Sequence, residues 1–137
     1  DQINTGMPEV VVSRLQDALN DHRQAVRGSR LLVLGVAYKR DIDDVRESPA
    51  LDVIELLWGK GATVEYHDPY VPSLRIGSHL LQSVPLGNLG DYDAVLILTD
   101  HSSIDYGAIG RSAKLVLDTR NATRNVDKTQ SCPIVRL

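Results

Sequence analysis

Apolar residues along the chain fall into short runs whose spacing changes from helical to continuous. From Met7 to about Val26 they recur at helical spacing, and Pro8 suits a first turn. The next run, RLLVLGVA from Arg30 to Ala37, is almost entirely apolar, as expected for a strand buried on both faces. The pattern predicts an amphipathic helix followed by a central parallel strand.

The alternation of helix and strand continues after a charged stretch. Ser48 and Pro49 form an N-cap and N1 pair, and Gly59 and Gly61 can stop the helix that follows. The run ATVEYH, residues 62–67, is typical of a second strand. We therefore expect a strand–helix–strand unit between residues 30 and 67.

The second half contains two further buried strands, Tyr92–Thr99 and Ala113–Thr119. Residues 71–88, rich in Ser, Gly and Pro, are ambiguous, with a short strand expected near Leu81–Val84.

A short helix is expected between the two later strands, capped by Asp100 or Ser102 and ending near Gly110. Strands that alternate with helices through short turns predict an α/β fold. The expected architecture is a Rossmann-like, doubly wound parallel sheet with helices on both faces.

Composition narrows the class of protein. The chain has 137 residues, of which 42% are hydrophobic, which is enough for one compact domain. Its net charge of −3, without a Lys/Arg block, argues against nucleic-acid binding. The absence of a long apolar run or leader argues against a membrane span, and the single cysteine, Cys132, fits a cytoplasmic protein. A start at Asp1, with the sole methionine at Met7, suggests an excised piece with further machinery upstream.

The sequence GVAYKRDIDDVRESPA, residues 35–50, concentrates charge where the first strand ends. Seven of the nine residues from Lys39 to Glu47 are charged. In a doubly wound sheet, ligands bind beyond the carboxyl ends of the strands. The stretches HDPY, TDHSS and DTRNATR would leave three other strands at the same edge.

A phosphate-binding glycine loop is not found in the sequence. Gly35 stands alone, without G-x-G-x-x-G, and there is no P-loop. Phosphate would instead need the cations Lys39, Arg46, Arg120 and Arg124 together with the amides of the helix that opens after the charged stretch. The alternative is that the charges pair with one another in solvent, where such pairs contribute little.

Other candidate residues each have a structural alternative. Asp43 and Asp44 could bind a metal or act as an acid–base pair, but adjacent cations favour a role in orienting Arg46 and Lys39. Asp68 could bind a ribose or form an Asp-Pro turn, and its spacing favours the turn.

Two histidines and the cysteine also have both a chemical and a structural interpretation. His67 and His101 could carry protons or be hydrogen-bonded loop histidines, and the second interpretation is favoured. Cys132 has no activating neighbour and is interpreted as a buried structural thiol. Trp58 is expected to pack in a core or interface, and Tyr38 either lies against a base or sugar or simply packs.

The sequences LLVLGVAYKRDIDDVRESPALDVIELL and GATVEYHDPYVP closely resemble the C-terminal, UDP-binding domain of the UDP-glucose/GDP-mannose dehydrogenases. AYKRDIDDVRESPAL with HDPYVP looks most like the branch that oxidises UDP-N-acetylglucosamine or UDP-N-acetylmannosamine. INTGMPEVVVSRL is similar to the end of the family's central helical region. The resemblance therefore implies a linker helix in residues 1–28 and a UDP-sugar-binding domain in 29–137.

The resemblance also implies a division of labour in a longer enzyme. An N-terminal domain would hold most of the NAD, a cysteine upstream would be the nucleophile, and two hydride transfers would convert the sugar C6 alcohol to a carboxylate. The full enzyme would be a homodimer or larger. No catalytic residue and no metal ligand is implied within these 137 residues.

Individual residues take roles by the same resemblance. Lys39 and Arg120 would contact the UDP-sugar with Tyr38 beside it, and Arg46 would face the NAD. Asp41 and Asp44 match motif positions expected to hold the charged loop. Two further hypotheses stay open: a stand-alone regulatory module that senses a nucleotide sugar, and an NAD-binding domain of another oxidoreductase, which the missing glycine fingerprint disfavours.

Overall fold

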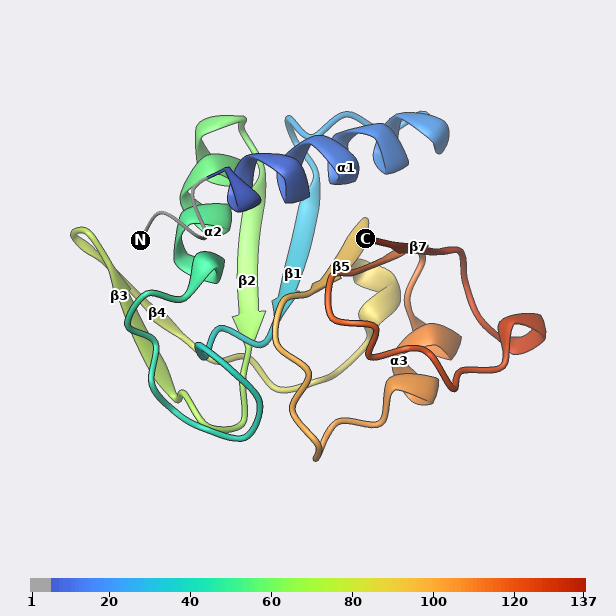
Figure 1. The fold of residues 1–137 in the computed structure, drawn as a ribbon. Helices are drawn as coiled ribbons and strands as arrows, with labels where there is room; N and C mark the ends of the chain where they lie inside the picture. Colours follow the sequence, from blue (N-terminus) through green and yellow to red (C-terminus); the bar gives the residue numbers. More distant parts are fainter. Residues whose placement is uncertain (1–5) are drawn as a thin grey trace.

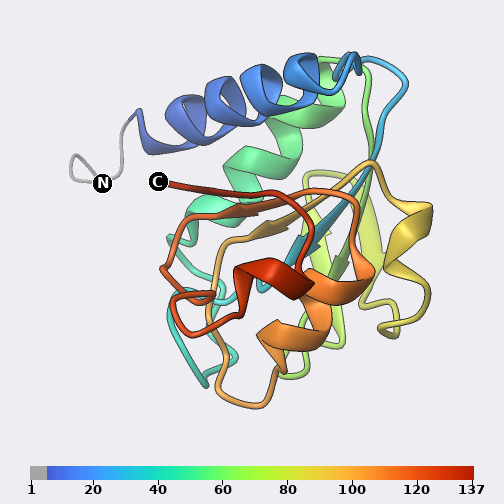
Figure 2. The same cartoon turned by 90° about the vertical axis from the view of Figure 1, so that its right-hand side faces the viewer.

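The computed structural model describes residues 6–137, which form a parallel five-stranded sheet covered on both faces (Figures 1 and 2). The strands, in spatial order, are β2 (Thr63–His67), β1 (Arg30–Leu34), β5 (Ala94–Ile97), β6 (Val116–Asp118) and β7 (Ile134–Arg136). The helices are α1 (Met7–Asp21), α2 (Pro49–Gly59), α3 (Tyr106–Ser112) and the 3-10 turns η2 (Leu89–Asp91) and η3 (Lys128–Gln130). The predicted α/β fold with a parallel sheet is confirmed.

The strand order contains a switch point. Counted along the chain, the parallel strands lie in the order 2-1-3-4-5, so successive connections leave β1 and β5 toward opposite edges of the sheet. In open α/β sheets, ligands bind in the crevice that forms where the strand order reverses. Here that crevice lies beyond the carboxyl ends of β1 and β5.

Two hydrophobic cores sandwich the sheet. On one face, α1 and α2 pack together and against alternate residues of β1, including Leu31 and Val33. On the other face, Leu32 and Leu34 pack with Ile109 of α3 and with residues of η2. Successive strand side chains point to opposite faces, which explains why every position from Leu31 to Leu34 is apolar.

The first helix is shorter than predicted. It ends at Asp21, and Arg23, in a left-handed conformation with φ of 59°, turns the chain out of the helix. Val26 is nevertheless buried, at 6% exposure, from the turn beyond the helix. The predicted helix was too long because Val26 is apolar and falls at helical spacing, although it lies beyond the end of the helix.

The stretch 71–88 contains a β-hairpin, β3 (Ser73–Ile76) with β4 (His79–Gln82), so the expected strand at Leu81–Val84 is displaced toward the N-terminus. Asp105 caps α3, not Asp100 or Ser102, and the helix ends at Ser112. Strand β7 was not predicted. Within residues 6–137, no helix has the length and apolar character needed to cross a bilayer.

Candidate functional site

A buried carboxylate ties together the loops that leave three neighbouring strands. Asp68, directly after β2, is 1% exposed. Its Oδ2 accepts hydrogen bonds from the amides of Val36 and Ala37, at 2.8 and 3.1 Å, and from His101 Nε2 at 2.9 Å. Its Oδ1 accepts from the amide of Tyr70 at 2.8 Å. Asp68 therefore acts as the structural turn residue rather than presenting its carboxylate to a ribose.

His101 links that carboxylate to the charged loop. Its ring is buried, and Nδ1 accepts a hydrogen bond from the amide of Asp41 at 2.9 Å, so the ring hydrogen lies on Nε2 and points at Asp68. The Asp41 carboxylate accepts from the amide of Ser102 at 2.8 Å and from its hydroxyl. These hydrogen bonds from Ser102 hold the pKa of Asp41 below its ordinary value. These hydrogen bonds thus hold the loops after β1, β2 and β5 together.

The remaining part of the charged loop is stabilised within itself. Both Asp44 oxygens accept from the Arg46 guanidinium, at 3.1 and 2.8 Å, and Oδ1 also accepts from the Arg46 amide. This fork lowers the pKa of Asp44 to about 2. The Asp44 carbonyl accepts from the amide of Tyr38 at 2.7 Å, which closes the loop. Glu47, with φ of 61°, turns the chain into the Ser48 cap of α2.

The carboxyl ends of β1, β5 and β6 enclose an open hollow of about 520 Å³, which we call the larger hollow. Its lining includes Lys39, Arg40, Asp100, Thr119, Arg120 and Asn121. Two of the predicted substrate residues, Lys39 and Arg120, are therefore brought together although they are far apart in sequence. Tyr38 and Arg46 are exposed in the same charged loop but do not line this hollow.

The sequence does not predict that Arg40 and Asp100 form an ion pair in the larger hollow. Arg40 Nη2 lies 2.5 Å from Asp100 Oδ2, and Arg120 Nε lies 3.9 Å from Asp100 Oδ1. The position of Asp100 directly beyond a buried strand at the switch point was the available signal. From the sequence alone, Asp100 is expected only as a helix cap.

The turn after β6 fixes the backbone that carries Arg120. Asp118 is fully buried, and its oxygens accept from the amides of Arg120, Ala122 and Thr123 at 2.8 to 3.1 Å. Burial acts to raise the pKa of Asp118, but the hydrogen bonds from Thr123 and these amides lower it overall. The Arg120 side chain is 39% exposed and projects into the larger hollow.

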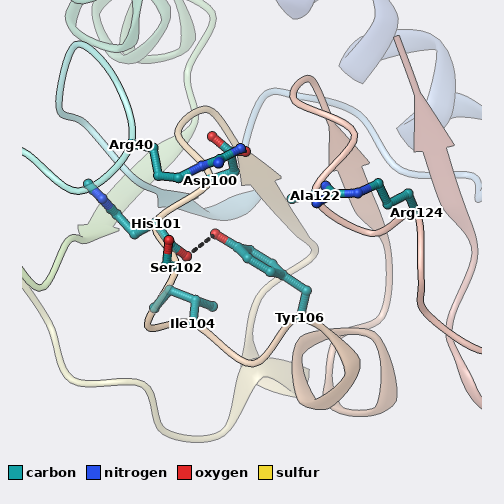
Figure 3. Close-up of a pocket in the computed structure, with 8 residues that line it drawn as sticks. All are labelled: Arg40, Asp100, His101, Ser102, Ile104, Tyr106, Ala122 and Arg124. Atoms are coloured by element: carbon teal, nitrogen blue, oxygen red, sulfur yellow. Dashed lines mark hydrogen bonds and ion pairs between the residues drawn. The ribbon is translucent and has the colours of Figure 1, made fainter.

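A second, smaller hollow of about 190 Å³ lies on the other side of the Arg40–Asp100 pair (Figure 3). Arg124 lines this hollow and not the larger one, and its Nη1 donates to the Asn121 carbonyl. Tyr106 donates to the His101 carbonyl at 3.1 Å, and burial raises its pKa. Arg124 is thus separated from Lys39 and Arg120 by an ion pair.

The turn after β1 does not provide a cradle for a dinucleotide. Gly35 has φ of 89°, but a Cβ placed there would lie 2.6 Å from the Thr99 carbonyl oxygen. Thr99 therefore occupies the space directly beside this glycine, and no second glycine follows in the turn to let the backbone approach a pyrophosphate. Residues of this turn do not fit NAD.

The remaining candidate residues make hydrogen bonds and packing contacts within the fold. His67 Nδ1 donates to the Val84 carbonyl at 2.7 Å, and Trp58 packs against the core and the ring of His79. Cys132 is half-buried rather than buried, and this partial burial raises the pKa of its thiol, which disfavours the nucleophilic thiolate. Among residues 6–137, no group of three or more His, Cys, Asp or Glu side chains is arranged to hold a metal.

Comparison with known proteins gives consistent matches. Residues 32–125 match the UDP-glucose/GDP-mannose dehydrogenase family, UDP binding domain. UDP-N-acetyl-D-mannosamine dehydrogenase of Pyrococcus horikoshii is 36% identical over 126 residues, which cover 88% of this chain and 28% of that protein. UDP-N-acetyl-D-glucosamine 6-dehydrogenase of Pseudomonas aeruginosa is 31% identical over 103 residues, covering 74% of this chain and 24% of that protein.

Solved structures agree with the sequence matches. The UDP-D-ManNAc dehydrogenase structure from Pyrococcus horikoshii superposes with a TM-score of 0.76 at 32% identity, over 98% of this chain and 31% of that one. The UDP-N-acetyl-mannosamine dehydrogenase Cap5O of Staphylococcus aureus gives a TM-score of 0.71 at 28% identity, over 98% and 32%. This chain spans less than a third of the length of these relatives.

Proposed function

This chain belongs to the UDP-glucose/GDP-mannose dehydrogenase family, whose UDP-binding domain it matches, and we propose that it supplies the nucleotide-sugar site of an NAD-dependent UDP-sugar 6-dehydrogenase. The proposed reaction oxidises the sugar C6 alcohol to a carboxylate by two hydride transfers to NAD. A UDP-N-acetylhexosamine is the proposed substrate, because relatives that act on UDP-N-acetylmannosamine and UDP-N-acetylglucosamine are among the matches.

The remaining parts of the enzyme would lie outside this sequence. We place the nucleophilic cysteine and the main NAD site in an N-terminal domain, with which this chain would pack. Residues 1–28 would form the end of the central region, of which 1–5 lie outside the described residues, and 29–137 would form the UDP-sugar domain. The complete enzyme would be a cytoplasmic homodimer or larger assembly.

The observation that carries the proposal is the cationic hollow at the switch point. Lys39 and Arg120 line it from the loops after β1 and β6. A diphosphate placed there would receive charge-assisted hydrogen bonds from both, each contributing about 1.5–3 kcal/mol. Such contacts replace the glycine-loop amides that this domain lacks, because Gly35 is covered by Thr99.

The other sequence-predicted residues take supporting roles in the proposal. Tyr38 would lie beside the ligand at the mouth of the hollow, and Arg46, with an 88% exposed side chain, would face the NAD across an interdomain cleft. Asp41 and Asp44 would hold the loop and its cations, which agrees with their hydrogen bonds to Ser102 and Arg46.

The test uses the complete protein and follows NADH formation with a panel of UDP-hexoses and UDP-N-acetylhexosamines. Lys39→Ala should lower turnover and substrate affinity together, and Lys60→Ala, which removes an exposed cation at the far end of α2, should leave both unchanged. Wild-type kinetics for Lys39→Ala would refute the assignment. Tight UDP-sugar binding without NADH formation would favour the sensing module instead.

A further inference from the structure

A carboxylate lies among the cations of the larger hollow, where an anion-binding site would ordinarily exclude one. Asp100 is held between Arg40 and Arg120, at 2.5 and 3.9 Å, and its side chain is 10% exposed. The two arginine side chains are 53% and 39% exposed, so they remain accessible to a ligand. Asp100 therefore competes with a bound anion for Arg40, whereas Arg120 lies beyond hydrogen-bond distance from it.

Asp100 also sets the charge of the larger hollow. The lining side chains carry three positive charges, on Lys39, Arg40 and Arg120, and one negative charge, on Asp100. Three positive charges less one negative charge leave a net charge of +2. A diphosphate that is esterified at both ends, as in a nucleotide sugar, carries one negative charge per phosphate and so matches this value.

A free nucleoside diphosphate differs from a nucleotide sugar in charge as well as in shape. Its terminal phosphate has a second ionisation with a pKa near 6, so at pH 7.5 it carries a third negative charge. That third charge would need a further free cation. In this hollow, Arg40 is already paired with Asp100 at 2.5 Å.

We propose that Asp100 is a specificity-determining residue that makes the larger hollow favour the diphosphate diester of a nucleotide sugar over a free nucleoside diphosphate. The carboxylate repels the third charge and keeps Arg40 from meeting it. The more distant Arg120 stays available to the diester. This inference rests on the proposed function, because it assumes that the larger hollow holds the diphosphate.

The direct test measures dissociation constants by calorimetry on the complete protein, with UDP and with the β-methyl ester of UDP. The two probes share base, ribose and both phosphates, and they differ by one ionisable oxygen. The wild-type protein should bind the ester at least as tightly as UDP. Asp100→Asn should shift the preference toward UDP by at least about fivefold, which is the size expected for one unit charge acting at about 4 Å through water-like surroundings.

Two further variants separate charge from shape. Asp100→Glu keeps the charge and should retain the wild-type preference. Asp91→Asn removes one exposed charge at the opposite end of β5 and should leave the ratio unchanged. Because long-range effects are screened by salt, the Asp100→Asn shift should also decrease as ionic strength rises.

The outcomes are distinguishable. A ratio that stays at the wild-type value in Asp100→Asn would overturn the inference and leave the proposed function intact. If Asp100→Asn does not fold, a wild-type protein that binds UDP more tightly than its ester would overturn the inference. Failure of the wild-type protein to bind either probe or UDP-N-acetylglucosamine would overturn the proposed function, and the inference with it.

Discussion

Replacing Asp68 by asparagine tests the hydrogen bonds that hold together the loops after β1, β2 and β5. The carboxylate accepts four hydrogen bonds, three at Oδ2 from buried donors and one at Oδ1 from the part-buried amide of Tyr70. Asparagine has nearly the same shape but offers only one acceptor oxygen. If that oxygen takes the place of Oδ2, the new amide group faces the Tyr70 amide, donor against donor.

The cost follows from these contacts. The part-buried Tyr70 amide, left without a partner, costs about 1 kcal/mol, and each of the three other hydrogen bonds loses about 1 kcal/mol when its acceptor becomes neutral. The total is about 4 kcal/mol, a large part of the roughly 5–15 kcal/mol that stabilises an ordinary domain. For a chain of this length, it corresponds to a fall in Tm of about 15 °C.

Urea denaturation of this chain at pH 7.5, followed by circular dichroism, measures the loss. Asp17→Asn, which changes an exposed carboxylate on α1, is the matched control and should change the unfolding free energy by less than about 0.5 kcal/mol. A loss below about 1 kcal/mol for Asp68→Asn would refute the reasoning, because it would show that the loops do not depend on this carboxylate.

Three other predictions concern single positions. Gly35→Ala should lower the unfolding free energy by about 3 kcal/mol or more, because φ is 89° and the new Cβ would lie 2.6 Å from the Thr99 oxygen; Gly87→Ala, with open space around it, should be nearly neutral in the same urea assay. Asp118 has a folded-state pKa below its unfolded value near 3.9, so its contribution is present above that pH and is lost as the pH falls through the folded pKa. Asp118→Asn should therefore reduce stability at pH 7 and flatten its decline below about pH 4; an unchanged acid titration would contradict this. Arg46→Ala in the complete protein should weaken NAD binding more than UDP-sugar binding in calorimetry, and equal losses would count against a role at the cleft.

The parallel sheet could be predicted because burial dictates the composition of its strands. β1 lies between two cores, so every position from Leu31 to Leu34 has to be apolar, and this pattern is visible without a structure. The start of α2 could also be predicted from the sequence. The Ser48 hydroxyl accepts a hydrogen bond from the Ala50 amide, and Pro49 has no backbone N–H that would need an acceptor in the first turn. Local chemistry decided both features.

Features that depend on distant contacts could not be predicted. β7 has three half-buried residues and lies at the sheet edge, so its pattern resembles that of a loop. The role of Asp100 depends on its contacts with Arg40, sixty residues earlier, and with Arg120 in the turn after β6. Lys39 and Arg120 were chosen by resemblance, and the structure adds that they line one hollow; their contact with a substrate stays a prediction.

The hydrogen bonds between Asp41 and Ser102 constrain how this domain could be re-engineered. A designer who wished to change ligand preference would graft the charged loop from a relative. That loop is bound to the segment after β5 through Asp41, Ser102 and His101, sixty-odd residues away in sequence. A chimera therefore has to exchange both segments together, because a grafted loop alone would lack the hydrogen-bond partners that fix its conformation.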